Sequence, residues 1–305
     1  MEHLIDIMQL STQEIDELVN TATDIIENPA KYAHKCDGRI LATLFFEPST
    51  RTRLSFESAM LSLGGKVLGF SSANSSSAAK GESVSDTIRT VSCYSDIIAM
   101  RHPKEGAPYV ASQAASIPVI NAGDGKHQHP TQAMLDLYTF RKQFGHLDGL
   151  KVAIVGDLSH SRVCGSLVPA LKTVGADVTL VGPPTFQVDD PDYFGVPQTA
   201  DFDSVIPEMD VVYMLRVQLE RMEGASIPSR REYNRLWGLD MSRVDKMKPE
   251  AIICHPGPMN RGMEINADVA DCARSRILTQ VNSGVLTRMA AMYLLLGGEN
   301  NGISA

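Results

Sequence analysis

The chain has 305 residues, of which 43% are hydrophobic and 21% charged, and its net charge is −8. This composition is typical of a globular protein with room for two domains, and the acidic balance argues against nucleic acid as the main partner. No apolar run approaches the ~20 residues of a membrane span, and the first residues lack a signal-peptide pattern, so we expect a cytoplasmic protein without a membrane span. The five cysteines form no Cys-x-x-Cys pair, so we expect neither a disulfide framework nor a zinc site.

Helical and strand patterns alternate from the N-terminus onward. A capping box at Ser11–Glu14 precedes a helix whose apolar face includes Ile25 and Ile26. The apolar run 40–46 predicts a strand, and the next helix covers about 50–63, with Ser49 as N-cap and Leu54 on its apolar face. The other elements expected in this half are an exposed, mobile loop at 71–79, a helix at about 83–94, strands at 97–100 and 118–121, and a helix at 130–144.

A composition break at 145–149 separates this region from a second set of elements. Strands alternating with helices predict an α/β fold of two domains, each with a central, mostly parallel sheet flanked by helices. The final helix, 283–296, is apolar on more than one face, so we expect it to be buried and to pack back on the first domain. The elements between are strands at 151–155, 177–181, 211–215 and 252–254, a helix at about 163–174, and a loop at 183–197.

Polar residues come at or just after the ends of five predicted strands. Ligands of open parallel sheets bind at the carboxyl ends of the strands, so these residues are expected to converge on shared sheet edges. They are Ser49–Thr52, Arg101 with His102, Arg162, Arg216 with Gln218, and His255–Pro258.

The most informative segment is Glu47–Arg53, at the start of the second predicted helix. Capping accounts for Ser49, but Arg51 and Arg53 place positive charge in a first turn where the helix dipole opposes it. An anion at the unpaired N–H groups of the turn would remove that conflict. The segment therefore predicts a site for a small phosphorylated molecule.

Two further loops carry candidate residues. The loop Asp124–Gln132 enters a helix at Pro130. Taken alone, it is explained equally well by a surface turn and by a functional loop. Together with the other segments, it makes His129 a candidate donor to a carbonyl oxygen. Its His-x-His triplet lacks the carboxylates or cysteines that a metal site needs, so no metal is expected. The loop 156–162 departs from the dinucleotide-binding Gly-x-Gly-x-x-Gly pattern at its second and third glycines.

Two arginines of the second half suit a dicarboxylate. Arg162 lies near a helix start and Arg216 follows a strand, and together they could clamp two carboxylates through bidentate pairs. A solvated charge run is the alternative explanation of 216–221, and a flexible linker is the alternative explanation of the segment that ends at Lys80-Gly81-Glu82.

Taken in order, these segments resemble the catalytic chains of the aspartate carbamoyltransferase family over nearly the whole sequence. The segment Arg-Val-Gln-x-Glu-Arg at 216–221 is similar to the corresponding motif of the aspartate enzymes, and Pro256 stands where the ornithine-using relatives have a cysteine. The matching segments are 45–53, 80–83, 100–103, 129–132, 156–162, 216–221 and 255–258.

The resemblance implies transfer of the carbamoyl group of carbamoyl phosphate to the α-amine of L-aspartate, the committed step of pyrimidine biosynthesis, without a cofactor. It implies a carbamoyl-phosphate domain at 1–132 plus 286–305 and an aspartate domain at 133–285. Two alternatives stay open: a carbamoyltransferase with another acceptor such as ornithine, and a catalytically silent binding homologue.

The resemblance also assigns roles to the candidates. Carbamoyl phosphate would be held by the phosphate, carbonyl and amide contacts of Ser49, Thr50, Arg51, Thr52, Arg101, His129, Gln132, Pro256 and Gly257, of which Arg51, Thr52, Arg101, His129 and Gln132 are the catalytic set. Aspartate would be held by Arg162, Arg216, Gln218 and Lys80, and Glu47 with Arg162 and Arg221 would support domain closure.

The resemblance implies a homotrimer with shared active sites, in which Ser76 and Lys80 come from the adjacent subunit. The loop before Lys80 is unusually rich in serine and alanine. A regulatory chain and a dihydroorotase stay open as further partners.

Overall fold

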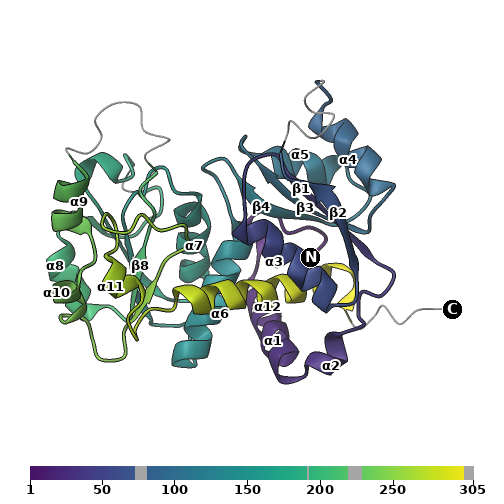
Figure 1. Ribbon diagram of the computed structural model, residues 1–305. Coiled ribbons are helices and arrows are strands. Elements are labelled where there is room, and N and C mark those ends of the chain that lie inside the picture. The colour runs from purple at the N-terminus through teal and green to yellow at the C-terminus, as the bar shows by residue number, and fades with distance from the viewer. Residues whose placement is uncertain (73–80, 191, 219–228, 299–305) are drawn as a thin grey trace. The chain divides into compact units, whose positions relative to one another are not determined.

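A computed structural model describes residues 1–72, 81–190, 192–218 and 229–298 of the chain (Figure 1). The chain forms two compact units. Unit 1 comprises Met1–Tyr138 and the C-terminal segment that starts at Val281, and unit 2 comprises Thr139–Gln280. Both limits fall inside helices, a few residues from the domain limits expected after residues 132 and 285.

Unit 1 is built on a parallel sheet with the strand order β2-β1-β3-β4. Helices α4 and α5 lie on one face, where Ile88 and Ala111 pack against apolar side chains of β1 and β3 (Figure 1). The near-continuous burial of β1, β3 and β4 is typical of parallel strands covered on both faces. The elements are a 3-10 helix at Ile7–Gln9, α1 (Thr12–Glu27), α2 (Pro29–Tyr32), β1 (Ile40–Phe45), α3 (Arg51–Ser62), β2 (Lys66–Phe70), α4 (Val84–Ser92), β3 (Ile97–His102), α5 (Ala107–Ala114), β4 (Val119–Asp124) and α6 (Pro130–Phe144), whose last residues belong to unit 2.

Unit 2 contains a second parallel sheet, with the order β7-β6-β5-β8-β9. Apolar side chains of β5, β8 and β9 form a buried core with residues of α8, α10 and α11, among them Phe202, Val244 and Val269. The elements are β5 (Lys151–Val155), α7 (Arg162–Thr173), β6 (Asp177–Val181), a 3-10 helix at Pro184–Phe186, β7 (Gln198–Thr199), α8 (Phe202–Val205), a 3-10 helix at Ile206–Glu208, β8 (Val211–Met214), α9 (Arg230–Trp237), α10 (Met241–Val244), β9 (Ile252–Cys254) and α11 (Ala267–Ala270).

The last helix, α12 (Ile277–Leu295), begins in unit 2 and continues in unit 1. In unit 1 the ring of Tyr293 packs edge-on against Tyr32 of α2, and the Arg288 guanidinium lies over Phe56 of α3. The expected α/β fold, the two parallel sheets and the return of the C-terminal helix to the first domain are confirmed. The helix starts at Ile277, six residues before the expected start at Ser283.

Local predictions fail where a side chain has a distant partner or where an apolar residue faces outward. The capping box is confirmed, because Ser11 and Glu14 exchange side-chain and backbone hydrogen bonds. The N-cap of α3, however, is Thr50 and not Ser49, whose hydroxyl accepts a hydrogen bond from Arg101 instead. Ile26 and Leu54, expected on apolar faces, are 46% and 57% exposed.

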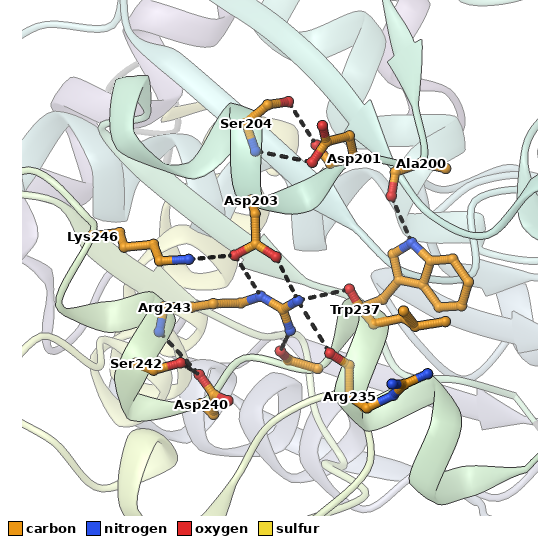
Figure 2. Close-up of polar contacts among 12 residues, drawn as sticks. Ala200, Asp201, Asp203, Ser204, Arg235, Trp237, Asp240, Ser242, Arg243 and Lys246 are labelled. Atoms are coloured by element: carbon orange, nitrogen blue, oxygen red, sulfur yellow. Dashed lines mark hydrogen bonds and ion pairs between the residues drawn. The ribbon is translucent and has the colours of Figure 1, made fainter.

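Figure 2 shows a polar network in unit 2 that caps the C-terminus of α9. Arg243 is buried and donates to the carbonyl oxygens of Arg235, Leu236 and Gly238, which are orphan acceptors at a helix C-terminus. Its guanidinium pairs with Asp203 at 3.0 Å, and Lys246 reaches the same carboxylate at 2.8 Å. The network therefore caps α9 and ties it to α8 and α10.

Replacing Asp203 by asparagine is expected to make the free energy of unfolding less dependent on pH in the acidic range. Hydrogen bonds from Arg243 and Lys246 lower the pKa of Asp203 to about 2. Because this value lies below that of an unfolded aspartate, the carboxylate stabilises the fold above about pH 4, and the contribution disappears as the pH falls toward 2. Asp203 is half exposed, so the loss at neutral pH is expected to be about 1 kcal/mol or less.

Urea unfolding between pH 7 and pH 3 measures this effect. The difference between wild type and Asp203→Asn is expected to shrink as the pH falls, whereas Asp189→Asn, which changes an exposed carboxylate, should leave the profile unchanged. A difference that stays constant over this pH range would contradict the assignment.

Candidate functional site

The segment between β1 and α3 presents a helix N-terminus at the carboxyl edge of the first sheet. Helix α3 has 12 residues and no acidic residue in its first turn, while Arg51 is exposed and Thr52 is buried there. The unpaired N–H groups and the dipole of this turn favour an anion, and the arginine adds positive charge beside them. The turn is therefore suited to bind a phosphate group.

Arg101 of the neighbouring strand β3 joins this segment. One terminal nitrogen, Nη1, lies 3.2 Å from the Ser49 hydroxyl and 3.5 Å from the Thr52 hydroxyl. Its Nε lies 2.6 Å from a carboxylate oxygen of Glu47, and both side chains of this ion pair are largely buried. The structure thus brings Ser49, Thr52 and Arg101 together as expected, and it shows that an incoming anion would compete with Glu47 for Arg101. The predicted role of Glu47 in domain closure stays a prediction.

The start of α6 supplies the next two candidates. It follows β4, which neighbours β3, so the helix begins on the edge that carries Arg101. His129, just before the first helical residue, is buried, and its carbonyl oxygen accepts the N–H of Gln132. The amide of Gln132 donates to Asp136 one turn further on, at 3.1 Å. Asp136 is fully buried and fixes the orientation of Gln132.

Sequence reasoning missed Arg288 of α12, which contacts both the start of α6 and the middle of α3. Its guanidinium donates to the Thr131 hydroxyl at 3.4 Å and to the Gly284 carbonyl at 2.9 Å, and lies 5.0 Å from the Phe56 ring centroid. A Cβ at Gly284 would meet this guanidinium, so a larger residue there would push the Arg288 side chain away from its present position. Burial lowers the pKa of Arg288 to about 9, although the Asp136 carboxylate opposes the shift.

In unit 2 three neighbouring strands, β5, β8 and β9, end beside one another. Arg162 is buried at the first position of α7, after β5, and Arg216 and Gln218 follow β8. The Gln218 amide donates to the carbonyl oxygen of His160 at 3.1 Å, which links the loops after β8 and β5. The expected gathering of Arg162, Arg216 and Gln218 on one edge of the second sheet therefore agrees with the strand order.

Pro256 and Gly257 lie in the loop that follows β9. His255, which precedes them, is buried, and its Nδ1 accepts the N–H of Gly257 at 2.8 Å. Gly257 has a φ of +64°, a left-handed conformation that favours glycine, and the Gly257-Pro258 peptide bond is cis. The backbone of this loop is thus fixed by a buried side chain.

Three of the candidates, Ser76, Lys80 and Arg221, lie outside the described residues. Within the described ranges, no cluster of histidine, cysteine, aspartate or glutamate side chains could hold a metal ion. None of the helices in those ranges is long and apolar enough to cross a bilayer.

Comparison with known proteins covers both units. Residues 2–142 match the carbamoyl-phosphate-binding domain of aspartate/ornithine carbamoyltransferases, and residues 148–295 match their aspartate/ornithine-binding domain. The chain is 48% identical to the aspartate carbamoyltransferase catalytic subunits of Salinispora tropica and Thermobifida fusca, over 98% of this chain and 99% and 96% of theirs.

Solved structures agree. The catalytic subunit of M. jannaschii aspartate transcarbamoylase superposes with a TM-score of 0.86 at 39% identity, over 99% of both chains. The Trypanosoma cruzi enzyme in complex with N-(phosphonacetyl)-L-aspartic acid gives 0.87 at 33% identity, over 96% of this chain and 95% of that one. The chain therefore belongs to the aspartate/ornithine carbamoyltransferase family.

Proposed function

We propose that this chain transfers the carbamoyl group of carbamoyl phosphate to the α-amine of L-aspartate, giving N-carbamoyl-L-aspartate and phosphate. The observation that carries the proposal is the cluster of Ser49, Thr52 and Arg101 at the N-terminus of α3. Relatives of known name support it, since the T. cruzi enzyme was solved with carbamoyl phosphate and aspartate together.

Unit 1 is proposed to bind carbamoyl phosphate. Ser49, Thr50, Arg51 and Thr52 would hold the phosphate with the backbone N–H groups of the turn. Arg101, His129 and Thr52 would donate to the carbonyl oxygen, and Gln132 would hold the amide nitrogen together with the backbone of Pro256 and Gly257, which belong to unit 2. Glu47 pairs with Nε of Arg101, while Nη1 of the same guanidinium faces Ser49 and Thr52, where the ligand would lie.

Unit 2 is proposed to bind aspartate. Arg162 and Arg216 suit its two carboxylates, because the planar guanidinium can pair with a carboxylate through two parallel hydrogen bonds. Gln218 would add a neutral donor, and its bond to the His160 carbonyl fixes its position.

The chemistry needs few protein groups. The uncharged α-amine attacks the carbonyl carbon, the C–N bond forms, and negative charge grows on the carbonyl oxygen. Donors at that oxygen act as an oxyanion hole, and removing one such donor typically lowers the rate by about 10²–10³-fold. The C–O bond to phosphate then breaks, and the leaving phosphate accepts the proton of the amine. Holding two anions together against their repulsion supplies much of the remaining rate enhancement.

One assay tests the proposal and the acceptor. The purified chain is incubated with carbamoyl phosphate and either aspartate or ornithine, and carbamoylaspartate and citrulline are measured. Carbamoylaspartate alone supports the proposal, and citrulline alone reassigns the acceptor, which matters because the matching family models cover both activities. Binding of carbamoyl phosphate without either product would indicate a silent homologue.

We also propose a homotrimer in which Ser76 and Lys80 enter the site of an adjacent subunit. The basis is the family resemblance, because both residues lie outside the described part of the chain. Mixing a Lys80→Ala chain with an Arg51→Ala chain tests it: partial recovery of activity is expected when one subunit supplies the residue that the other lacks, and no recovery would place all the residues within one chain.

A further inference from the structure

A partly buried hydrogen-bond network in unit 2 connects the loop after β9 to the residues after β8. It starts at His255, whose Nδ1 accepts the Gly257 N–H and therefore carries no proton. The proton lies on Nε2, which donates to a carboxylate oxygen of Glu264 at 3.2 Å. His255 and Glu264 are almost entirely buried, so this pair fixes the loop from inside the protein.

Asn260 extends the network across to β8. Its backbone N–H donates to the same oxygen of Glu264 at 2.5 Å, so one carboxylate atom holds both His255 and Asn260. Its side-chain amide donates to the carbonyl oxygen of Val217 at 3.0 Å. Val217 lies between Arg216 and Gln218, two of the residues proposed to bind aspartate.

Val217 is a fixed point of the backbone. Its side chain is fully buried with Phe186, Tyr233 and Met263, while its carbonyl accepts the Asn260 amide. Both the side chain and the carbonyl of Val217 are held in place. The backbone at Val217 therefore fixes the direction of the neighbouring Arg216 side chain. A buried carbonyl that loses its donor costs more free energy than an average hydrogen bond contributes, so the chain is expected to shift when Asn260 is changed.

We propose that Asn260 is a positioning residue, which sets the spacing between Arg216 and the Pro256-Gly257 backbone by bridging Glu264 and the Val217 carbonyl. The proposal rests on the proposed function, because Arg216 and this backbone are assigned there to the two reactants. Asn260 itself touches no substrate in this scheme. It links the aspartate-binding residues to the loop that would hold the amide nitrogen of carbamoyl phosphate.

The chain offers a matched control in Asn234 of α9. Its side-chain amide also donates to a backbone carbonyl of the same loop region, that of Met263, at 2.8 Å, and to Asn266 at 2.9 Å. These bonds anchor the far side of residues 260–266 and do not reach Val217. Asn260→Asp and Asn234→Asp thus remove comparable amide donors. Only the Asn260 amide bonds to Val217, the neighbour of Arg216.

Steady-state kinetics with the full chain test the proposal. Asn260→Asp is expected to raise the KM for aspartate about tenfold, with a smaller change in the KM for carbamoyl phosphate, because the phosphate-binding residues lie in unit 1. Glu264→Gln keeps an acceptor oxygen for both donors and should stay close to wild type, whereas Glu264→Ala should behave like Asn260→Asp. Asn234→Asp should lower the unfolding temperature without a selective effect on aspartate.

Binding of succinate, a dicarboxylate without an amine, separates this proposal from the proposed function. Calorimetry with carbamoyl phosphate present measures succinate affinity without turnover, and the same loss of about tenfold is expected for Asn260→Asp. If wild type forms no carbamoylaspartate but this loss is seen, the proposed function fails and the positioning role stands. Unchanged succinate affinity in Asn260→Asp, or an equal loss in Asn234→Asp, would overturn the positioning role.

Discussion

Replacing Arg51 by alanine is expected to reduce kcat by about 10²–10³-fold while the fold stays intact, the range found when one donor to a transition-state anion is removed. Arg51 is exposed at the first position of α3, so truncating its side chain opens no cavity in the core. Its positive charge opposes the helix dipole, so stability should be unchanged or slightly higher. Initial rates and thermal unfolding, measured on the same preparation, check both expectations.

Arg53 provides the control, because it lies in the same turn and pairs with a carboxylate of its own helix. Its Nε lies 2.6 Å from a carboxylate oxygen of Glu57, which also accepts the Thr43 hydroxyl. Arg53→Ala should therefore change stability more than turnover. Similar losses of activity in the two variants would mean that general positive charge, and not the placement of Arg51, supports the reaction.

Replacing Arg216 by alanine is expected to raise the aspartate requirement by about 30-fold or more, since truncating one partner of a hydrogen-bonded charge pair typically costs about 2–5 kcal/mol. The affinity for carbamoyl phosphate should change little, because its phosphate contacts are proposed for unit 1. Initial rates over a range of aspartate at saturating carbamoyl phosphate measure the first effect, and calorimetry with carbamoyl phosphate alone measures the second.

Two further variants show whether the geometry of Arg216 matters. Arg216→Lys keeps the charge but loses the planar fork, so it should recover only part of the aspartate affinity. Arg230→Ala removes an exposed arginine at the first position of α9 and should leave the aspartate dependence unchanged. An unaltered aspartate dependence in Arg216→Ala would reassign that residue.

The sequence predicts the elements that have a strong local signal. Apolar runs such as 151–155 are buried strands, and the capping box at Ser11 starts α1 as expected. The edge strand β2 was missed because it is only partly buried and contains Gly69, which weakens both the apolar pattern and the propensity. Helix α5 was missed because it begins at small residues after Gly106, without a side-chain cap.

The sequence also indicates the candidate site residues, but not the distant residues with which they form contacts. Arg101 and Arg216 stand at or after strand ends, which the chain order shows. The Arg101–Glu47 ion pair and the contact of Arg288 with Thr131 join residues far apart in the sequence, and periodicity carries no information about such pairs. An arginine inside an apolar helix was the available signal for Arg288, because a buried charge needs partners.

Helix α12 has a consequence for how the chain acquires its structure. Unit 1 is completed by a segment that the ribosome makes only after unit 2. A fragment ending between α6 and β5 would contain the whole first sheet, yet Phe56 and Tyr32 would lack the Arg288 and Tyr293 side chains that pack on them. During synthesis the first-made half therefore stays incomplete until the C-terminal helix is released, and no single cut divides the chain into two self-sufficient pieces.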